Sequence, residues 1–127
     1  MLQQTQVKTV IPYFNNFVKK IPSLKALSNS NEKTVLKLWE GLGYYTRAKN
    51  LHKTSKILIK KYNGQIPKSF VKLKELPGIG DYTANILLAL IYNQARIALD
   101  GNVKRVLFRL DNINSEDAIN LFKTKRN

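Results

Sequence analysis

Apolar residues recur every three or four positions along most of the chain, and polar residues fill the positions between them. This spacing predicts amphipathic helices over residues 1–20, 31–42, 44–61, 82–93 and 103–110. A short helix capped by Ser23 is expected through Leu27, and Pro67 should open another. No segment keeps the period-two alternation of a half-buried strand. The pattern therefore predicts an all-α fold.

The same spacing predicts which side chains face the core. Trp39 is most simply a core residue, flanked on its helix by four aliphatic residues: Val35, Leu36, Leu38 and Leu42. In the next helix we expect Leu51, Ile57, Leu58 and Tyr62 to point inward. Thr5 is a plausible N-cap for the first helix. Asn63-Gly64 is typical of a turn.

One short stretch, Leu76-Pro77-Gly78-Ile79-Gly80, interrupts this helical pattern just before the most apolar helix of the chain. Pro77 fixes its own φ and should end the preceding helix. The two glycines permit positive φ and leave no side chain between the backbone and an approaching ligand. The helix that follows offers N–H groups and the positive end of its dipole to an anion such as phosphate. An ordinary corner between two helices is the alternative interpretation.

The charge of the chain favours the anion-binding interpretation. At 127 residues, long enough for one domain, it carries 22 Lys and Arg against 8 Asp and Glu, a net charge of +14. Such a field attracts polyanions, of which nucleic acid is the commonest. A membrane surface, a ribosomal neighbourhood or an AT-rich genome would also account for it. The basic residues of the 44–61 helix are, by themselves, more typical of a solvated face.

Several classes of site are disfavoured by composition. The chain has no cysteine, so its residues can form no disulfide, zinc thiolate site or iron–sulfur ligation. A single histidine, His52, leaves little for a metal site, and none is predicted. Residues 1–10 lack the features of a signal peptide. The longest apolar run, residues 86–92, is too short to span a bilayer. We therefore expect a soluble, cytoplasmic protein without a membrane partner.

Four blocks of the sequence together resemble one family. They are Met1-Leu2-Gln3-Gln4-Thr5-Gln6-Val7, Trp39-Glu40-Gly41-Leu42-Gly43-Tyr44-Tyr45, Leu76-Pro77-Gly78-Ile79-Gly80-Asp81-Tyr82-Thr83-Ala84 and Asp100-Gly101-Asn102-Val103-Lys104-Arg105-Val106. Their order and spacing resemble the adenine DNA glycosylases, the MutY branch of the helix-hairpin-helix, endonuclease III-like glycosylase superfamily. The resemblance covers residues 1–110, with the hairpin at 76–84. The polar, basic tail at 111–127 matches poorly.

The resemblance implies a fold and an activity. Members of that family fold as a six-helix barrel packed against an iron–sulfur domain, and this chain would supply an incomplete barrel. They excise adenine mispaired with 8-oxoguanine or guanine during base excision repair. The implied partner is double-stranded DNA carrying an adenine:8-oxoguanine mismatch, in a nucleoid-associated setting. The oligomeric state is not predicted.

The resemblance also implies roles for individual residues. Asp100 matches the aspartate that stabilises the cationic sugar as the glycosidic bond breaks; read alone, it is a helix N-cap. Tyr82 stands where endonuclease III-like enzymes have a Schiff-base lysine, and a phenol cannot form that adduct. Gln4 matches a residue that wedges into the duplex, and Tyr44 one that stacks near the oxidised guanine. The stretch 76–80 would hold the DNA phosphate. Without the family, Gln4 is a polar surface residue, and Tyr44 and Tyr82 mark helix starts.

Other expected family features lie outside the chain. The general-acid glutamate of the family stands two residues before the first block, so it would precede Met1. Glu32, Glu40, Glu75 and Glu116 match no such motif. The cysteines that hold a [4Fe-4S] cluster in the family are absent. These features predict a fragment truncated at both ends that binds DNA weakly and cleaves poorly.

Three alternatives to an adenine glycosylase stay open. A non-catalytic helix-hairpin-helix DNA-binding remnant would use the same hairpin. An endonuclease III-like glycosylase is the nearest rival enzyme. The presence of Tyr82 and of Gln3-Gln4 argues against it. A basic protein of a ribonucleoprotein particle would explain the charge but not the four blocks.

Overall fold

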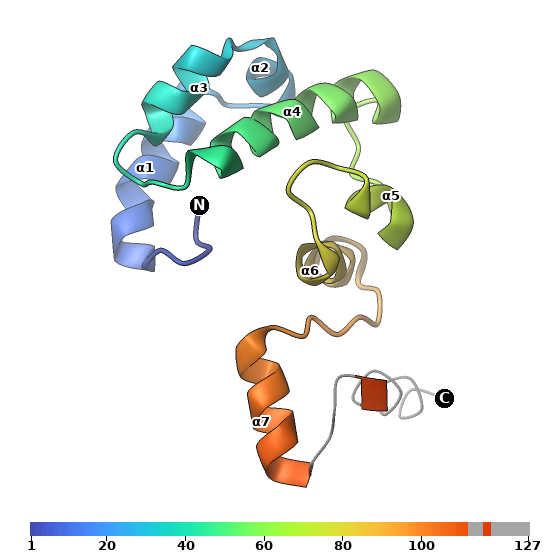
Figure 1. Cartoon of the computed structure of the whole chain (residues 1–127). Helices are drawn as coiled ribbons and strands as arrows, with labels where there is room; N and C mark the ends of the chain where they lie inside the picture. Colours follow the sequence, from blue (N-terminus) through green and yellow to red (C-terminus); the bar gives the residue numbers. More distant parts are fainter. Residues whose placement is uncertain (112–115, 118–127) are drawn as a thin grey trace. The chain divides into compact units, whose positions relative to one another are not determined.

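A computed structural model describes residues 1–111, 116 and 117 of the chain. Its helices, in order, are α1 (Val7–Lys20), α2 (Leu24–Asn29), α3 (Glu32–Trp39), α4 (Tyr45–Tyr62), α5 (Phe70–Lys74), α6 (Asp81–Tyr92) and α7 (Gly101–Asp111) (Figure 1). The described residues form no strand, which confirms the predicted all-α fold. The predicted tail, 111–127, lies outside the described residues except at positions 111, 116 and 117.

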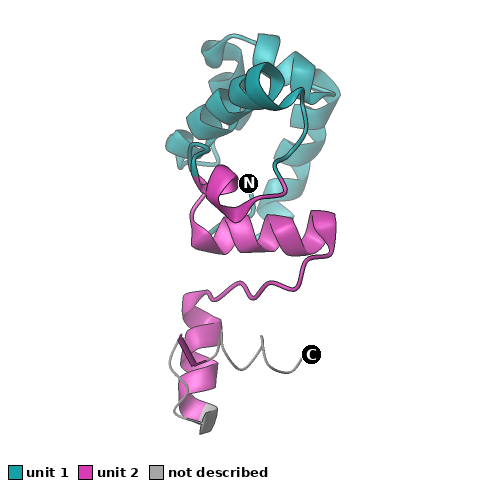
Figure 2. Cartoon of the chain, turned by 90° about the vertical axis from the view of Figure 1, so that its right-hand side faces the viewer, with its two compact units in different colours: residues 1–67, 75–78 teal, residues 68–74, 79–127 magenta. Residues whose placement is uncertain are grey.

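The chain divides into two compact units (Figure 2). The first unit holds residues 1–67 and 75–78, and the second holds residues 68–74 and the described residues from 79 onward. The stretch 76–80 therefore passes from one unit to the other. Each unit positions a different set of the predicted site residues.

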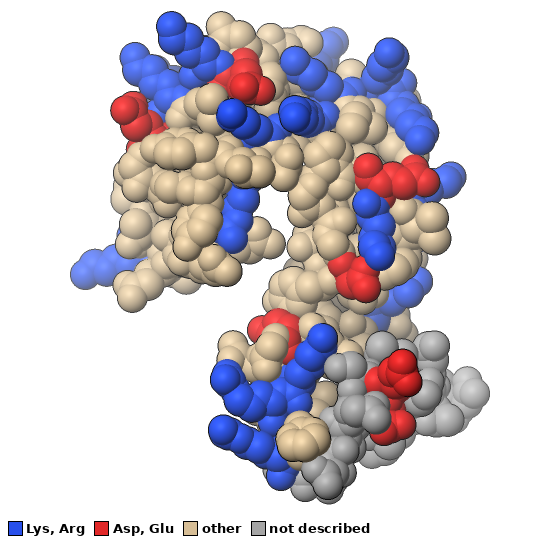
Figure 3. All heavy atoms as spheres, viewed as in Figure 1, with Lys and Arg blue, Asp and Glu red and all other residues tan. Residues whose placement is uncertain are grey.

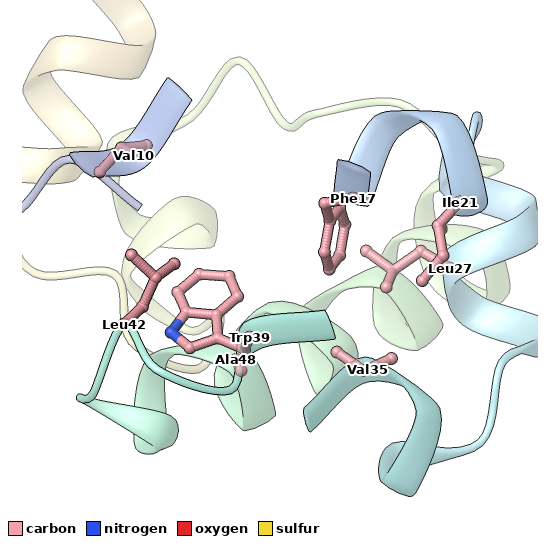
Figure 4. Packing of buried hydrophobic residues seen from close by; sticks show 8 residues of the cluster. All are labelled: Val10, Phe17, Ile21, Leu27, Val35, Trp39, Leu42 and Ala48. Atoms are coloured by element: carbon pink, nitrogen blue, oxygen red, sulfur yellow. The ribbon is translucent and has the colours of Figure 1, made fainter. Parts of the chain in front are cut away.

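The core of the first unit is built where α1 and α3 face each other (Figure 4). The rings of Phe17 and Trp39 meet edge to face, with their centroids 6.3 Å apart. Trp39 is only 3% exposed, which confirms its predicted place in the core. The other buried members of the cluster are Val10, Ile21, Leu27, Val35, Leu42 and Ala48. Removing this much apolar surface from water supplies most of the driving force for folding.

The inward face predicted for α4 is confirmed at Leu58, which is buried, but is wrong at Leu51. Leu51 was expected inward but is 39% exposed, whereas its neighbour His52 is 2% exposed. The Nε2 atom of His52 lies 2.8 Å from the carbonyl oxygen of Ser30, which satisfies the buried ring. Ala48 and Ser55 are fully buried on the same face, since their small side chains let α2 and α3 pack closely. The interhelical contacts, rather than hydrophobicity alone, set the orientation of the helix.

Predicted helix starts are confirmed in one case and wrong in another. The hydroxyl oxygen of Ser23 accepts a hydrogen bond from the Ala26 N–H at 3.1 Å, as an N-cap should. Thr5, however, does not cap α1. That helix begins at Val7 after Gln6, whose side chain makes no capping hydrogen bond.

The second unit packs α5 against α6. Leu73, Ala84 and Leu88 are fully buried. The side-chain amide of Gln94 donates to the carbonyl of Lys68 at 3.2 Å, which ties the segment after α6 to the start of the unit. Within the part of the chain that is described, no helix is long and apolar enough to cross a membrane.

Candidate nucleic-acid interface

The first half of the hairpin is held by α4. The side chain of Leu76 is buried, and the Thr54 hydroxyl donates to the Pro77 carbonyl at 3.1 Å. Gly78 has φ of +77°, a left-handed conformation that glycine adopts without strain. A Cβ at Gly78 would also lie 2.9 Å from the Asn50 side-chain nitrogen. Conformation and space therefore both favour glycine at position 78.

The second half of the hairpin is the N-terminal end of α6. Gly80 is the N-cap of α6 with φ of −95°, and its carbonyl accepts the Ala84 N–H at 2.9 Å. The positive φ that the sequence allows is thus used at Gly78 and not at Gly80. A Cβ added at Gly80 would meet nothing within 4 Å. The backbone at the head of α6 can therefore be approached closely by an anion.

An ion pair stands beside this helix end. The Lys74 ammonium lies 2.6 Å from a carboxylate oxygen of Asp81, and both side chains are largely exposed. Asp81 is the first residue of α6, where a negative charge stabilises the helix dipole. The same charge would repel a phosphate, and Lys74 compensates for it.

In the first unit, Arg47 contacts Tyr44 and the backbone beside Gln4. Its guanidinium donates to the carbonyl oxygen of Gln3, next to Gln4. It also lies over the Tyr44 ring, 4.6 Å from the centroid, in a cation–π contact. Burial, and secondly the Arg47 charge, lowers the pKa of the Met1 amino group below its ordinary value. Arg47 therefore links the N-terminal turn to the start of α4.

Gln4 and Tyr44 share a second property. Both have positive φ, +59° and +52°, which is uncommon for residues with a side chain. Such strain persists only where the surroundings hold it, and it is often found at functional positions. Tyr44 is 55% exposed, so its ring is available to a partner.

The loop before Tyr44 is held at two points. The indole N–H of Trp39 donates to the Gly43 carbonyl at 3.0 Å, and the Gly41 N–H donates to the Tyr45 hydroxyl at 3.3 Å. The buried Trp39 thereby connects the core to the exposed ring of Tyr44. These two hydrogen bonds hold the loop in one conformation, so the aromatic side chain of Tyr44 is presented in a fixed place.

In the second unit, Asp100 is the N-cap of α7. One of its carboxylate oxygens accepts the Val103 N–H at 2.7 Å, and its carbonyl accepts the Lys104 N–H at 3.0 Å. The side chain is half-buried. The predicted capping role is confirmed. Because one carboxylate oxygen is held by the Val103 N–H, the orientation of the whole carboxylate group is fixed.

Tyr82 lies in the first turn of α6, two residues after Gly80, and is 41% exposed. No hydrogen bond between Tyr82 and Asp100 occurs among the described residues, although both belong to the second unit. Gln4 and Tyr44 belong to the first unit. The predicted residues are thus divided between the two units, and no hydrogen bond joins Tyr82 to Asp100 within the described part of the second.

No group of three or more His, Cys, Asp or Glu residues that could hold a metal ion occurs within residues 1–111, 116 and 117. The 127-residue sequence also contains no cysteine, so the residues present do not fit an iron–sulfur cluster.

Three supporting residues were not singled out from the sequence. Asn50 and Thr54 contact the hairpin, and Arg47 joins Gln3 to Tyr44. All three lie on α4, where they were hidden in a long polar and basic pattern. Their only sequence signal was the position of Asn50 and Thr54 one turn apart on one helix face.

Comparisons with known proteins found similar sequences and a matching family. The sequence model of the family described as "HhH-GPD superfamily base excision DNA repair protein" matches residues 1–125. An adenine DNA glycosylase of Buchnera aphidicola subsp. Baizongia pistaciae is 54% identical over 114 residues, which are 90% of this chain and 32% of that protein. The human adenine DNA glycosylase is 38% identical over 122 residues, 95% of this chain and 22% of that protein. The chain thus spans about a third or less of these relatives.

Solved structures share the fold. A non-covalent complex of endonuclease III with DNA has a TM-score of 0.79 and 27% identity, over 97% of this chain and 58% of that chain. A thermostable thymine-DNA glycosylase has a TM-score of 0.82 and 22% identity, over 97% and 60% of the two chains.

Proposed function

The chain belongs to the HhH-GPD superfamily of base excision DNA repair proteins, and we propose that it is the DNA-binding and glycosylase core of an adenine DNA glycosylase. Its reaction is hydrolysis of the N-glycosidic bond of adenine mispaired with 8-oxoguanine or guanine. The identity of 54% to the Buchnera protein of that name supports the choice of adenine.

The observation that carries this proposal is the fixed carboxylate of Asp100. When the bond between the sugar and adenine breaks, positive charge develops on the sugar. A carboxylate already oriented by the Val103 N–H stabilises that charge without reorganising during the reaction. Water then supplies the hydroxyl group that replaces adenine on the sugar, and the departing adenine takes up a proton.

DNA binding is assigned to two groups of residues. The hairpin, residues 76–84, offers the backbone of its two glycines and the head of α6 to a phosphate. Such contacts position the protein without reading the base sequence. Gln4 and Tyr44 act on the bases, because a nucleotide that leaves the stack must be replaced by protein side chains. Arg47 contacts the Tyr44 ring and the carbonyl oxygen of Gln3, the residue before Gln4. The solved complexes of endonuclease III with DNA support this part of the proposal.

Tyr82 separates this activity from that of a lyase. A glycosylase that also cleaves the strand needs an amine to form a Schiff base with the sugar. Tyr82 stands in the first turn of α6 and offers only a phenol. The proposed enzyme is therefore monofunctional and leaves an abasic site.

The test is a base-release assay on the protein expressed from the whole reading frame that encodes these residues. Duplexes carrying adenine opposite 8-oxoguanine, guanine or thymine are incubated under single-turnover conditions, and free adenine is measured by chromatography. We expect release opposite 8-oxoguanine and guanine but not opposite thymine. Binding without release from any duplex would indicate a DNA-binding remnant. A covalent adduct trapped by borohydride would indicate an endonuclease III-like enzyme.

A further inference from the structure

One helix face outside the proposed site carries an unusual arrangement of charge. Lys49, Lys53, Lys56 and Lys60 follow one another at intervals of four, three and four residues along α4. These intervals place all four on one face of the helix. All four side chains are exposed. We call these four residues the lysine stripe, and we propose that it is a second contact surface for the phosphate backbone of duplex DNA, separate from the hairpin.

The lysine stripe lies opposite the packed face of α4. Ala48, His52, Ser55 and Leu58 are buried on that packed face. The exposed lysines are therefore not used to build the core. Figure 3 shows Lys and Arg atoms spread along the part of the first unit that α4 occupies in Figure 1.

Few negative charges offset the lysine stripe. α4 contains no Asp or Glu. Lys61 pairs with Glu75 and Lys74 pairs with Asp81, and neither lysine belongs to the stripe. Lys49 and Glu40 line the same shallow hollow at one end, so the least compensated part runs from Lys53 to Lys60. Like charges three or four residues apart repel each other, and a bound polyanion would relieve that repulsion.

The dimensions and chemistry of the lysine stripe fit a duplex. It extends over about 16 Å of helix, and the same length of DNA axis presents about five phosphates on each strand. Lysine ammonium groups bind phosphates as point charges, without reading the bases. No Phe, Trp or Tyr lies between residues 46 and 61, so the stripe lacks the stacking platforms that single strands need.

Duplex DNA as the partner rests on the proposed repair function, because a glycosylase must stay on undamaged DNA while it searches for a mispair. Contacts of this kind are sequence-independent and permit sliding. The lysine stripe would thus raise the affinity for undamaged DNA, while the hairpin and Tyr44 act at the lesion.

The test compares two triple variants of equal charge. In the first, Lys53, Lys56 and Lys60 of the lysine stripe are replaced by glutamine. In the control, Lys8, Lys19 and Lys20 of α1, which are also exposed, are replaced by glutamine. Each variant loses three positive charges, and circular dichroism checks that both keep their helices. Binding to an undamaged duplex of mixed sequence is measured by fluorescence anisotropy over a range of salt concentrations.

We expect the stripe variant to show a slope of log K against log salt that is smaller by about 2 to 3, since each lost phosphate contact contributes about 0.9. The control variant should change the slope by less than 1. Equal slopes in the two variants would overturn the proposal, since net charge alone would then explain binding. If the stripe variant lost as much affinity for polyglutamate as for the duplex, the proposal would also be overturned, and an acidic protein partner would be favoured instead.

The outcome is separable from that of the base-release assay. If the wild-type protein releases no adenine but the two triple variants still differ in slope, the proposed activity fails and the lysine stripe stands. If adenine is released and the slopes are equal, the lysine stripe fails and the activity stands.

Discussion

Two glycines two residues apart should respond to alanine in different ways. Gly78 has φ of +77°, and a new Cβ would lie 2.9 Å from the Asn50 side-chain nitrogen. The left-handed conformation costs an alanine about 1–2 kcal/mol, and the shift of Asn50 adds to this. We therefore expect Gly78→Ala to lower the free energy of unfolding by at least about 1–2 kcal/mol, or the melting temperature by at least roughly 3–8 °C.

Gly80 lacks both of those constraints. Its φ is −95°, and a Cβ there would meet nothing within 4 Å. Gly80→Ala should leave the melting temperature within about 2 °C of the wild-type value. Its methyl group would instead occupy the space through which a phosphate approaches the backbone. Losing one hydrogen bond to a charged group costs about 1.5–3 kcal/mol, or roughly 10–100-fold in Kd.

The two variants are measured side by side. Thermal unfolding followed by circular dichroism gives their stability, and fluorescence anisotropy with a labelled duplex gives their Kd. Because both changes are Gly→Ala in the same hairpin, each is the control for the other. The reasoning is refuted if Gly78→Ala melts at the wild-type temperature, or if Gly80→Ala binds DNA with wild-type affinity.

Two further variants test the electrostatics of the site. Asp81→Asn removes the negative charge beside the phosphate position and should tighten duplex binding about 2–5-fold, at a small cost of about 0.3–1 kcal/mol in helix stability; unchanged or weaker binding in anisotropy would contradict this. Arg47→Ala removes the cation–π contact with Tyr44 and the hydrogen bond to Gln3, and should weaken binding to a mispaired duplex by about 1–2 kcal/mol, or 5–30-fold. An equal loss for undamaged duplex would show that Arg47 acts on the backbone instead.

The sequence predicted the helices well because their apolar spacing is regular. Trp39 was assigned correctly to the core, since a large aromatic residue on the apolar face of a helix is usually buried. The assignment of Leu51 was wrong, because α4 is oriented by its contacts with α2 and α3. His52 is buried instead of Leu51, and this is possible only because the Ser30 carbonyl provides a hydrogen-bond partner for the His52 ring. That partner is 22 residues away, and no local pattern contains it.

In the candidate site, too, local features could be predicted from the sequence, whereas contacts between distant residues could not. The capping geometry of Asp100 is local, so the sequence was enough to predict it. The contact of Arg47 with Gln3 joins residues 44 positions apart, and the support of Pro77 by Thr54 spans 23 positions. Such contacts depend on how helices pack. A single sequence identifies the residues that meet a ligand more readily than those that hold them in place.

The most direct test of the account is the effect of Asp100→Asn on adenine release. Asparagine caps a helix as well as aspartate, so the hydrogen bond from Val103 and the fold should be kept, while the negative charge is lost. With the protein from the whole reading frame and a duplex carrying adenine opposite 8-oxoguanine, the single-turnover rate should fall by about 10²–10³-fold at unchanged Kd. Asp81→Asn, at the start of the other helix, should leave that rate within a few-fold of wild type. Wild-type adenine release by Asp100→Asn would contradict the account.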